Sequence, residues 1–191
     1  MGRGDTGKKE GSLNLTFNYI VLDTETTGLS PSEDEILQLS IIDQTGSVLF
    51  DEYFKPKADS WDDAMAVNGI TPDMVKDKMP ISNHKDQIEA ILSGAELIVG
   101  YNVGFDLSML EGEGIDLPDI PVYDVMREFA PIYGEYNEYY GSYRWQSLTT
   151  AAGYYDYDWS SHEDQAHNSL ADCFATQFVF EKMQEYSKND L

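Results

Sequence analysis

The chain has 191 residues, 41% of them hydrophobic and 13% aromatic, which is enough apolar material for one globular domain with an ordinary core. Its formal net charge of −23, from 35 acidic and 12 basic residues, argues against a protein that holds nucleic acid through a broad basic surface. The sequence shows no signal-peptide pattern and no apolar run near the ~20 residues of a membrane span, and its one cysteine, Cys173, excludes an internal disulfide, so we expect a cytoplasmic protein without membrane contact.

The beginning of the chain differs in composition from the rest. Residues 1–16 are rich in glycine and charge and lack hydrophobic periodicity, so we predict a flexible N-terminal tail there. Residues 17–191 carry all the periodic segments, without an internal repeat, and we predict that they form a single domain.

The first predicted strand, Ile20–Asp23, ends in two acidic residues. Asp23 and Glu25 are two positions apart, so they point to the same face of an extended chain. Two unpaired carboxylates so close repel each other, which favours a cation between them, and hard oxygen ligands suit magnesium or manganese. The alternative is an ordinary turn after a strand, capped by Asp and Thr side chains.

The next segments predict a hairpin and a helix. Residues 36–42 and 48–54 are apolar and flank the turn signal Gln44–Gly46, which is typical of two antiparallel strands. Residues 83–92 place Ile88, Ile91 and Leu92 on one face of a helix, with Ser82 or Asn83 as its cap.

A second acidic position follows the predicted strand Leu97–Val99. The polar turn Asn102–Asp106 leads into an apolar helical pattern, so Asp106 lies where a strand ends and a helix begins. Asp106 can be a ligand for the same cation, or it can simply cap the helix. A further short strand is predicted at Val122–Asp124.

The stretch 133–159 is unusually aromatic; it contains Tyr133, Tyr136, Tyr139, Tyr140, Tyr143, Trp145, Tyr154, Tyr155, Tyr157 and Trp159. Aromatic side chains stack on single-stranded bases without needing positive charge. The alternative, which we favour for most of them, is packing within the domain or at a subunit contact. Trp145 lies within residues 144–148, which resemble a helix start in the pattern of a known family, so we interpret it as structural.

The last predicted helix, from about Ser169 to Tyr186, follows a third group of polar residues. It carries Asp172 near its start, and His167 precedes it by five residues. Residues five apart on a helix differ by ~140° in direction, so we expect His167 in the loop or first turn and Asp172 on the helix itself. Each has a simpler interpretation as a surface residue, and His162 is interpreted as a solvated loop residue.

These three segments, taken in order, resemble the three exonuclease motifs of the DEDD family of 3′–5′ exonucleases, also called DnaQ-like. The run Asp23–Gly28 is similar to the first motif, Asn102–Asp106 to the second and His167–Asp172 to the third, with the spacing of the histidine (DEDDh) subclass. The family includes the proofreading epsilon subunit of bacterial DNA polymerase III. The resemblance implies an α/β, ribonuclease-H-like fold with a mixed five-stranded sheet flanked by helices, and makes residues 17–191 the exonuclease domain.

The resemblance also implies roles for individual residues. Four acids would hold two divalent cations, Mg²⁺ or Mn²⁺: Asp23, Glu25, Asp106 and Asp172. His167 would be the general base, which suits its unperturbed pKa near 6.5. Four further positions would contact the terminal nucleotide: Thr26, Leu29, Asn102 and Phe105. The alternative for Leu29 and Phe105 is an ordinary core position.

One position departs from the family pattern. Asn68 stands where a similar family segment usually has histidine, so substrate affinity or preference is expected to differ. The implied reaction is the metal-dependent release of nucleoside 5′-monophosphates from single-stranded or frayed 3′ ends, with DNA favoured, as in proofreading or repair. Two alternatives stay open: an RNA-trimming enzyme of the same family, and an exonuclease-like module that acts mainly as a polymerase-associated subunit. A DNA polymerase that delivers the strand would also account for activity despite the acidic surface.

Overall fold

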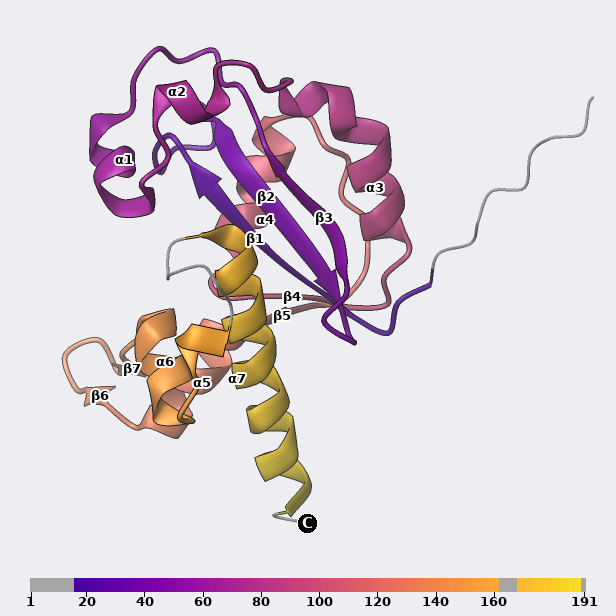
Figure 1. The fold of residues 1–191 in the computed structure, drawn as a ribbon. Coiled ribbons are helices and arrows are strands. Elements are labelled where there is room, and N and C mark those ends of the chain that lie inside the picture. The colour runs from indigo at the N-terminus through magenta and orange to yellow at the C-terminus, as the bar shows by residue number, and fades with distance from the viewer. Residues whose placement is uncertain (1–15, 162–167, 190–191) are drawn as a thin grey trace, which may run out of the picture.

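The computed structural model describes residues 16–161 and 168–189, and in that part a central sheet is covered by helices on both faces (Figure 1). The five strands lie in the order β3-β2-β1-β4-β5. The predicted tail, residues 1–16, lies outside the described residues except for Thr16, so the N-terminal domain boundary stays a prediction.

The sheet is mixed, as predicted. Strands β1 (Ile20–Thr26), β2 (Ile36–Asp43) and β3 (Val48–Tyr53) form an antiparallel meander. Strands β4 (Ile98–Gly100) and β5 (Val122–Asp124) continue the sheet in parallel with β1. The carboxyl ends of three parallel strands therefore meet at one edge, where β1 contributes its acidic residues. Because β1 extends to Thr26 rather than ending at Asp23, both acids lie within the strand.

Alternation along β1 sorts its side chains between two cores. Ile20 and Leu22 pack with α3 (Lys85–Ser93) and α4 (Val103–Gly112) on one face. Val21 packs on the other face with α5 (Val125–Tyr133), α6 (Leu148–Tyr154) and α7 (Ser169–Asn189). Asp23 and Glu25 follow Val21 in register, so they belong to the α7 face.

Two short helices close the end of the sheet toward which β1 points (Figure 1). Helices α1 (Asp62–Asn68) and α2 (Pro72–Val75) surround a small third core of Leu37, Trp61, Ile70 and Val75. The remaining elements are the hairpin of β6 (Tyr136–Asn137) and β7 (Ser142–Tyr143), and the 3₁₀ turns η1 (Ile81–His84) and η2 (Trp159–Ser161).

The predicted start of the third helix is wrong. Helix α3 begins at Lys85, after η1, and neither Ser82 nor Asn83 caps it. The reason is that Asn83 N–H donates to Pro80 O, which closes a tighter turn first and buries Ile81. Cys173 is buried. Among the helices of residues 16–161 and 168–189, none combines the length and apolar character needed to cross a membrane.

Candidate metal and nucleotide site

Three predicted acids come together on the α7 face of the sheet. Asp23 and Glu25 project from β1, and Asp172 projects from the first turn of α7. One carboxylate oxygen of each lies within 4.8 Å of the others, and all three side chains are partly buried. This arrangement of hard oxygen atoms is suited to a divalent cation.

The fourth acid, Asp106, approaches from the opposite face of β1. It lies in the first turn of α4, is only 3% exposed, and is not part of the three-carboxylate cluster. Thr24 donates to its Oδ1 twice, from the main-chain nitrogen at 3.0 Å and from Oγ1 at 2.7 Å. Asp106 is nevertheless close enough that its charge raises the pKa of both Asp23 and Glu25.

The pKa values of three site acids, Asp23, Glu25 and Asp106, are all raised, and burial is the largest cause for each. Burial first, and then the charges of Asp172 and Asp106, raise the pKa of Glu25 to about 8. Burial likewise raises the pKa of Asp106 to about 7 against the lowering effect of the Thr24 hydrogen bonds, and raises that of Asp23. Neither Asp23 nor Glu25 pairs with a lysine or arginine within the described residues. Asp23 and Glu25 therefore repel each other without a neutralising cation among the described side chains, and the residues present fit a bound dication.

Helix α7 is anchored to the sheet at its first residues. Ser169 is fully buried, with its Oγ 2.6 Å from Ser40 Oγ on β2. Asn168 accepts hydrogen bonds from the main-chain nitrogens of Leu170 and Ala171, as a helix cap does, and donates to Tyr53 Oη at 3.1 Å. These contacts fix where Asp172 points. His167, the predicted base, lies just outside the described residues.

A cavity of about 790 Å³ opens beside the carboxylates. Three of the four residues predicted to contact substrate line it: Thr26, Leu29 and Phe105. Phe105 also packs against the core around α4, so both interpretations of this residue apply. The other residues that line the cavity are Thr24, Glu25, Thr27, Gly28, Ser30, Asp34, Asp63, Ala64, Val67 and Asn68.

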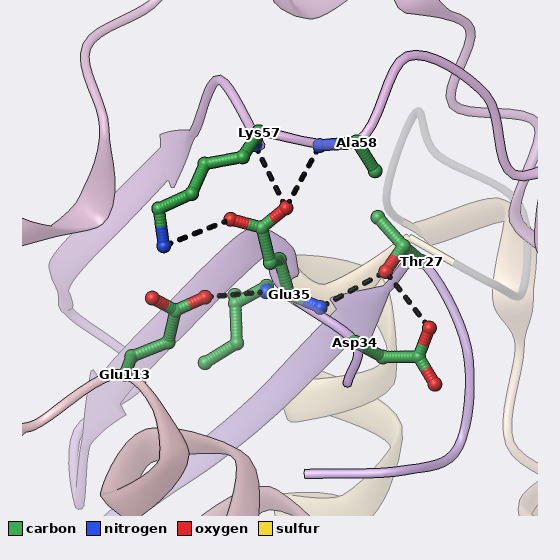
Figure 2. A network of polar contacts seen from close by, with 7 residues as sticks. Thr27, Asp34, Glu35, Lys57, Ala58 and Glu113 are labelled. Carbon is green, nitrogen blue, oxygen red and sulfur yellow. Dashed lines mark hydrogen bonds and ion pairs between the residues drawn. The ribbon is translucent and has the colours of Figure 1, made fainter. Parts of the chain in front are cut away.

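Leu29 is exposed on a loop that Asp34 holds in place through hydrogen bonds. Its side chain is 84% exposed at the mouth of the cavity. Asp34 accepts from Ser30 N at 2.8 Å and from Thr27 Oγ1 at 3.2 Å, and a Cβ on Gly28 would overlap the Asp34 carboxylate. Figure 2 shows the hydrogen bond between Thr27 and Asp34 and the adjoining network, in which Glu35 accepts main-chain hydrogen bonds from residues 57 and 58.

Asn68 supports β1 rather than standing free in the cavity. Its Nδ2 donates to Thr26 O at 3.2 Å and its Oδ1 accepts from Ile70 N at 3.0 Å. A hydrogen bond from the Asn68 side chain also lowers the pKa of Glu25. The wall formed by Asp63, Ala64 and Val67 of α1 was not predicted, since this short helix buries none of its residues and has no apolar stripe. The unusual residue at position 68 was the only signal there.

Asn102 occupies the N-cap position of α4. It precedes α4 in the left-handed conformation, with φ 63° and ψ 37°, which asparagine tolerates better than most residues. Its main-chain nitrogen donates to Asp124 Oδ1 at 3.1 Å. It is not among the described residues that line the cavity, so its contact with substrate stays a prediction.

A mixed five-stranded sheet whose central strand carries paired carboxylates next to a cavity defines a nuclease of the ribonuclease-H-like class. The exonuclease family model (RNase_T) matches residues 20–180. The chain therefore belongs to this exonuclease family, the DnaQ-like 3′–5′ exonucleases, as its three motifs predicted.

The individual relatives agree with this assignment. The chain is 28% identical over 178 residues to a PolC-type DNA polymerase III of Latilactobacillus sakei, which covers 87% of the chain and 11% of that protein. It is 34% identical over 103 residues to the DNA polymerase III subunit epsilon of Rickettsia felis, covering 51% and 44%. Exonuclease X, solved with 5′ overhanging duplex DNA, has the same fold, with a TM-score of 0.67, 21% identity, and coverage of 89% and 93%. The chain spans 7% to 18% of three large curated relatives.

Proposed function

We propose that this protein is a metal-dependent 3′–5′ exonuclease that releases nucleoside 5′-monophosphates from single-stranded or frayed 3′ ends of DNA. The observation that carries the proposal is the cluster of Asp23, Glu25 and Asp172 within 4.8 Å, whose member Glu25 also lines a cavity of about 790 Å³. The family assignment supports the reaction class, and the carboxylate cluster supports this position for the reaction.

The four acids would hold two Mg²⁺ or Mn²⁺ ions. When bound, such a pair stabilises the attacking and leaving oxygens of an in-line displacement at phosphorus. Asp23, Glu25 and Asp172 form one oxygen-lined side of the site. Asp106 reaches the same site from α4, and Thr24 fixes its orientation by two hydrogen bonds.

His167 is the residue that would accept the proton of the attacking water. Its support is positional: it precedes Asp172 by five residues, and the two residues that follow it, Asn168 and Ser169, are hydrogen-bonded to β3 and β2. A neutral imidazole near neutral pH is a suitable acceptor.

The terminal nucleotide would occupy the cavity next to the carboxylates. Leu29, Val67 and Phe105 give it apolar contacts, and the exposed Leu29 would press against the base and separate it from its neighbour or its pairing partner. This would select for a strand end that is single-stranded or frayed. Asn68 and Asp34 would not contact the nucleotide themselves. Asn68 would hold Thr26 in place, and Asp34 would hold the loop that carries Leu29.

DNA is the favoured substrate because the matched relatives include DNA polymerase III proteins, and Exonuclease X was solved with DNA. RNA is the second candidate, since human RNA exonuclease 4 is 28% identical over 122 residues, 58% of the chain. A DNA polymerase is the proposed partner. It would bring the strand end to a protein whose net charge of −23 disfavours long-range attraction of nucleic acid.

A time course on matched 5′-labelled single-stranded DNA and RNA tests the function. We expect a descending ladder of DNA products with Mg²⁺ or Mn²⁺, slower degradation of RNA, and no products with a chelator. Asp23→Asn should be inactive, whereas Asp59→Asn, at an exposed position outside the site, should be active. Internal cleavage fragments, or a ladder that survives chelation, would contradict the proposal.

A further inference from the structure

An exposed aromatic surface lies outside the cavity, on the segment around β6 and β7. Of the aromatic side chains in residues 133–159, seven are exposed: Tyr133, Tyr136, Tyr139, Tyr140, Tyr143, Trp145 and Tyr154. Tyr139 is 88% and Trp145 61% exposed, so the expectation that Trp145 is structural is wrong. Tyr155, Tyr157 and Trp159 are partly buried against the core beneath α7, and the exposed Tyr133 and Tyr154 touch its edge through Phe129. Figure 1 shows this segment grouped with α5 and α6 beside α7.

Trp145 is connected to the loop that follows β4. The hydroxyl of Tyr101 donates to Gln146 O at 2.8 Å, which ties the chain next to Trp145 to the end of β4. The guanidinium of Arg127 lies 5.7 Å from the centre of the Trp145 ring, and Arg127 Nε is 3.3 Å from Asp124 Oδ2. These contacts place Trp145 close to the strand edge that carries the acidic site.

The same contacts reach the second exonuclease motif. Asp124 Oδ1, beside Arg127, accepts from the main-chain nitrogen of Asn102. Three residues later in that motif Phe105 lines the cavity, and Asp106, the next residue, accepts from Thr24 between the two β1 acids. One continuous set of contacts therefore runs from the exposed indole to the proposed nucleotide site.

The charges around Trp145 favour stacking over phosphate attraction. The chain has three arginines, and Arg127 and Arg144 are both in this region. Arg144 is held by Glu135 at 2.8 Å, and Arg127 is held by Asp124. Little positive charge is therefore available, but the ring stacked under Arg127 is pre-oriented and still largely exposed. Unpaired nucleobases are the ligand that such a surface fits, because every base offers a π-face.

We propose that Trp145, oriented by Arg127, is a stacking site for an unpaired base of the strand being degraded, 5′ of the nucleotides at the carboxylates. This inference rests on the proposed function, because it assigns a second contact to the same substrate. It explains how so acidic a protein holds a polyanion: the added affinity comes from aromatic contact and depends weakly on salt, whereas lysine and arginine contacts to phosphate weaken steeply with salt.

Rates on substrates of three lengths test the proposal: a thymidine 5′-nitrophenyl phosphate ester, dT3 and dT12. We expect Trp145→Ala to lower kcat/KM for dT12 by about 5- to 150-fold through KM, the loss that corresponds to one stacked base. Hydrolysis of the single-nucleotide ester should not change. Trp145→Phe, which keeps an aromatic ring, should recover most of the dT12 rate. Met79→Ala, an exposed apolar control outside the aromatic segment, should match the wild type.

Tryptophan fluorescence gives a reading that does not depend on turnover. In an Asp172→Asn background, which blocks hydrolysis, dT12 should quench the emission and dT3 should quench it far less. Trp145→Phe should remove the quenching while dT12 still binds. Absent hydrolysis by wild-type protein combined with intact quenching would overturn the proposed function but not the stacking site.

Two results would overturn the stacking site itself. One is an equal loss on dT12 and on the single-nucleotide ester in Trp145→Ala. The other is dT12 binding without Trp145 quenching, together with a change from dimer to monomer in Trp145→Ala by sedimentation. The second result would assign the aromatic surface to contact between copies of the chain.

Discussion

Thr24 and Asp106, 82 residues apart, are joined by two hydrogen bonds to a single carboxylate oxygen. Thr24 lies between Asp23 and Glu25 but points to the other face of β1, so the strand presents acids on one side and holds the fourth acid from the other. Because β1 has contacts on both faces, Asp106 of α4 and Asp172 of α7 both lie near the end of this strand.

Thr24→Val tests this relationship, because it removes the hydroxyl and keeps the shape. Loss of one buried hydrogen bond should destabilise the protein by about 0.5–1.5 kcal/mol. Since that bond lowers the pKa of Asp106, its loss should raise this pKa further and weaken binding of divalent ions. We expect the Mg²⁺ concentration for half-maximal activity to increase severalfold. Thr24→Ser should stay close to wild type; equal metal dependence in all three proteins would contradict the role of Thr24.

Neutral replacements of the clustered acids should separate activity from stability. Asp23→Asn and Asp172→Asn should lose nearly all exonuclease activity, because each removes an oxygen ligand. In the presence of chelator both should unfold at a higher temperature than wild type at pH 8, since each removes one charge that repels the neighbouring acids. Thermal unfolding by circular dichroism measures this effect. A lower unfolding temperature would show that the acids are not repelling one another.

The raised pKa of Glu25 predicts how metal-free stability depends on pH. The folded protein keeps this proton up to about pH 8, while the unfolded chain releases it near 4.5, so between these values the folded state binds more protons. The free energy of unfolding in chelator should therefore fall as pH rises from about 4.5 to 8. Glu25→Gln should reduce the slope. A rising or flat profile in this window would contradict the shift.

The raised pKa values of Glu25 and Asp106 also predict how the affinity for Mg²⁺ depends on pH. Because the ion displaces protons from Glu25 and Asp106, its affinity should increase with pH up to about 8, and protons should be released on binding. Calorimetric titrations at pH 6.5, in buffers with different ionisation enthalpies, measure the number released. Heats that do not depend on the buffer would mean that the acids are already ionised in the metal-free protein.

His167→Ala should reduce the rate of the chemical step by about 10²–10⁴, the usual contribution of a general base. The measurement is single-turnover cleavage of a 5′-labelled oligonucleotide at saturating enzyme. His162→Ala is the matched control, five residues earlier in the chain, and should behave like wild type. Unchanged turnover in His167→Ala would show that the proton goes elsewhere.

Gly28→Ala should displace the loop that presents Leu29, because the added methyl group would overlap the Asp34 carboxylate. We expect kcat/KM on duplex ends to fall by about tenfold or more, with a smaller effect on single strands, and an unfolding temperature within a few degrees of wild type. Adding Asp34→Ala makes room for the methyl group, so the double variant should be less impaired than the sum of the single effects. Strict additivity would show that the two residues act separately.

The prediction from sequence succeeded where local pattern decides the structure. Alternation along 20–26 was enough to put Asp23 and Glu25 on one side, and the three ordered motifs were enough to predict the mixed sheet and the family. It failed at the start of α3, because the 3₁₀ turn η1 forms directly before it, and it did not predict α1, a short helix that buries none of its residues.

The sequence by itself therefore determined which residue types are present and which face of their own strand or helix they occupy, since spacing along a strand or helix sets direction. Only the tertiary structure decided how segments far apart along the chain meet. It put Asp172 next to Glu25 through the buried start of α7, turned Asp106 onto Thr24, and left Trp145 exposed beside the strand edge. Those distances depend on how two separate cores pack against the two faces of one sheet, and the local pattern of side chains does not encode that packing.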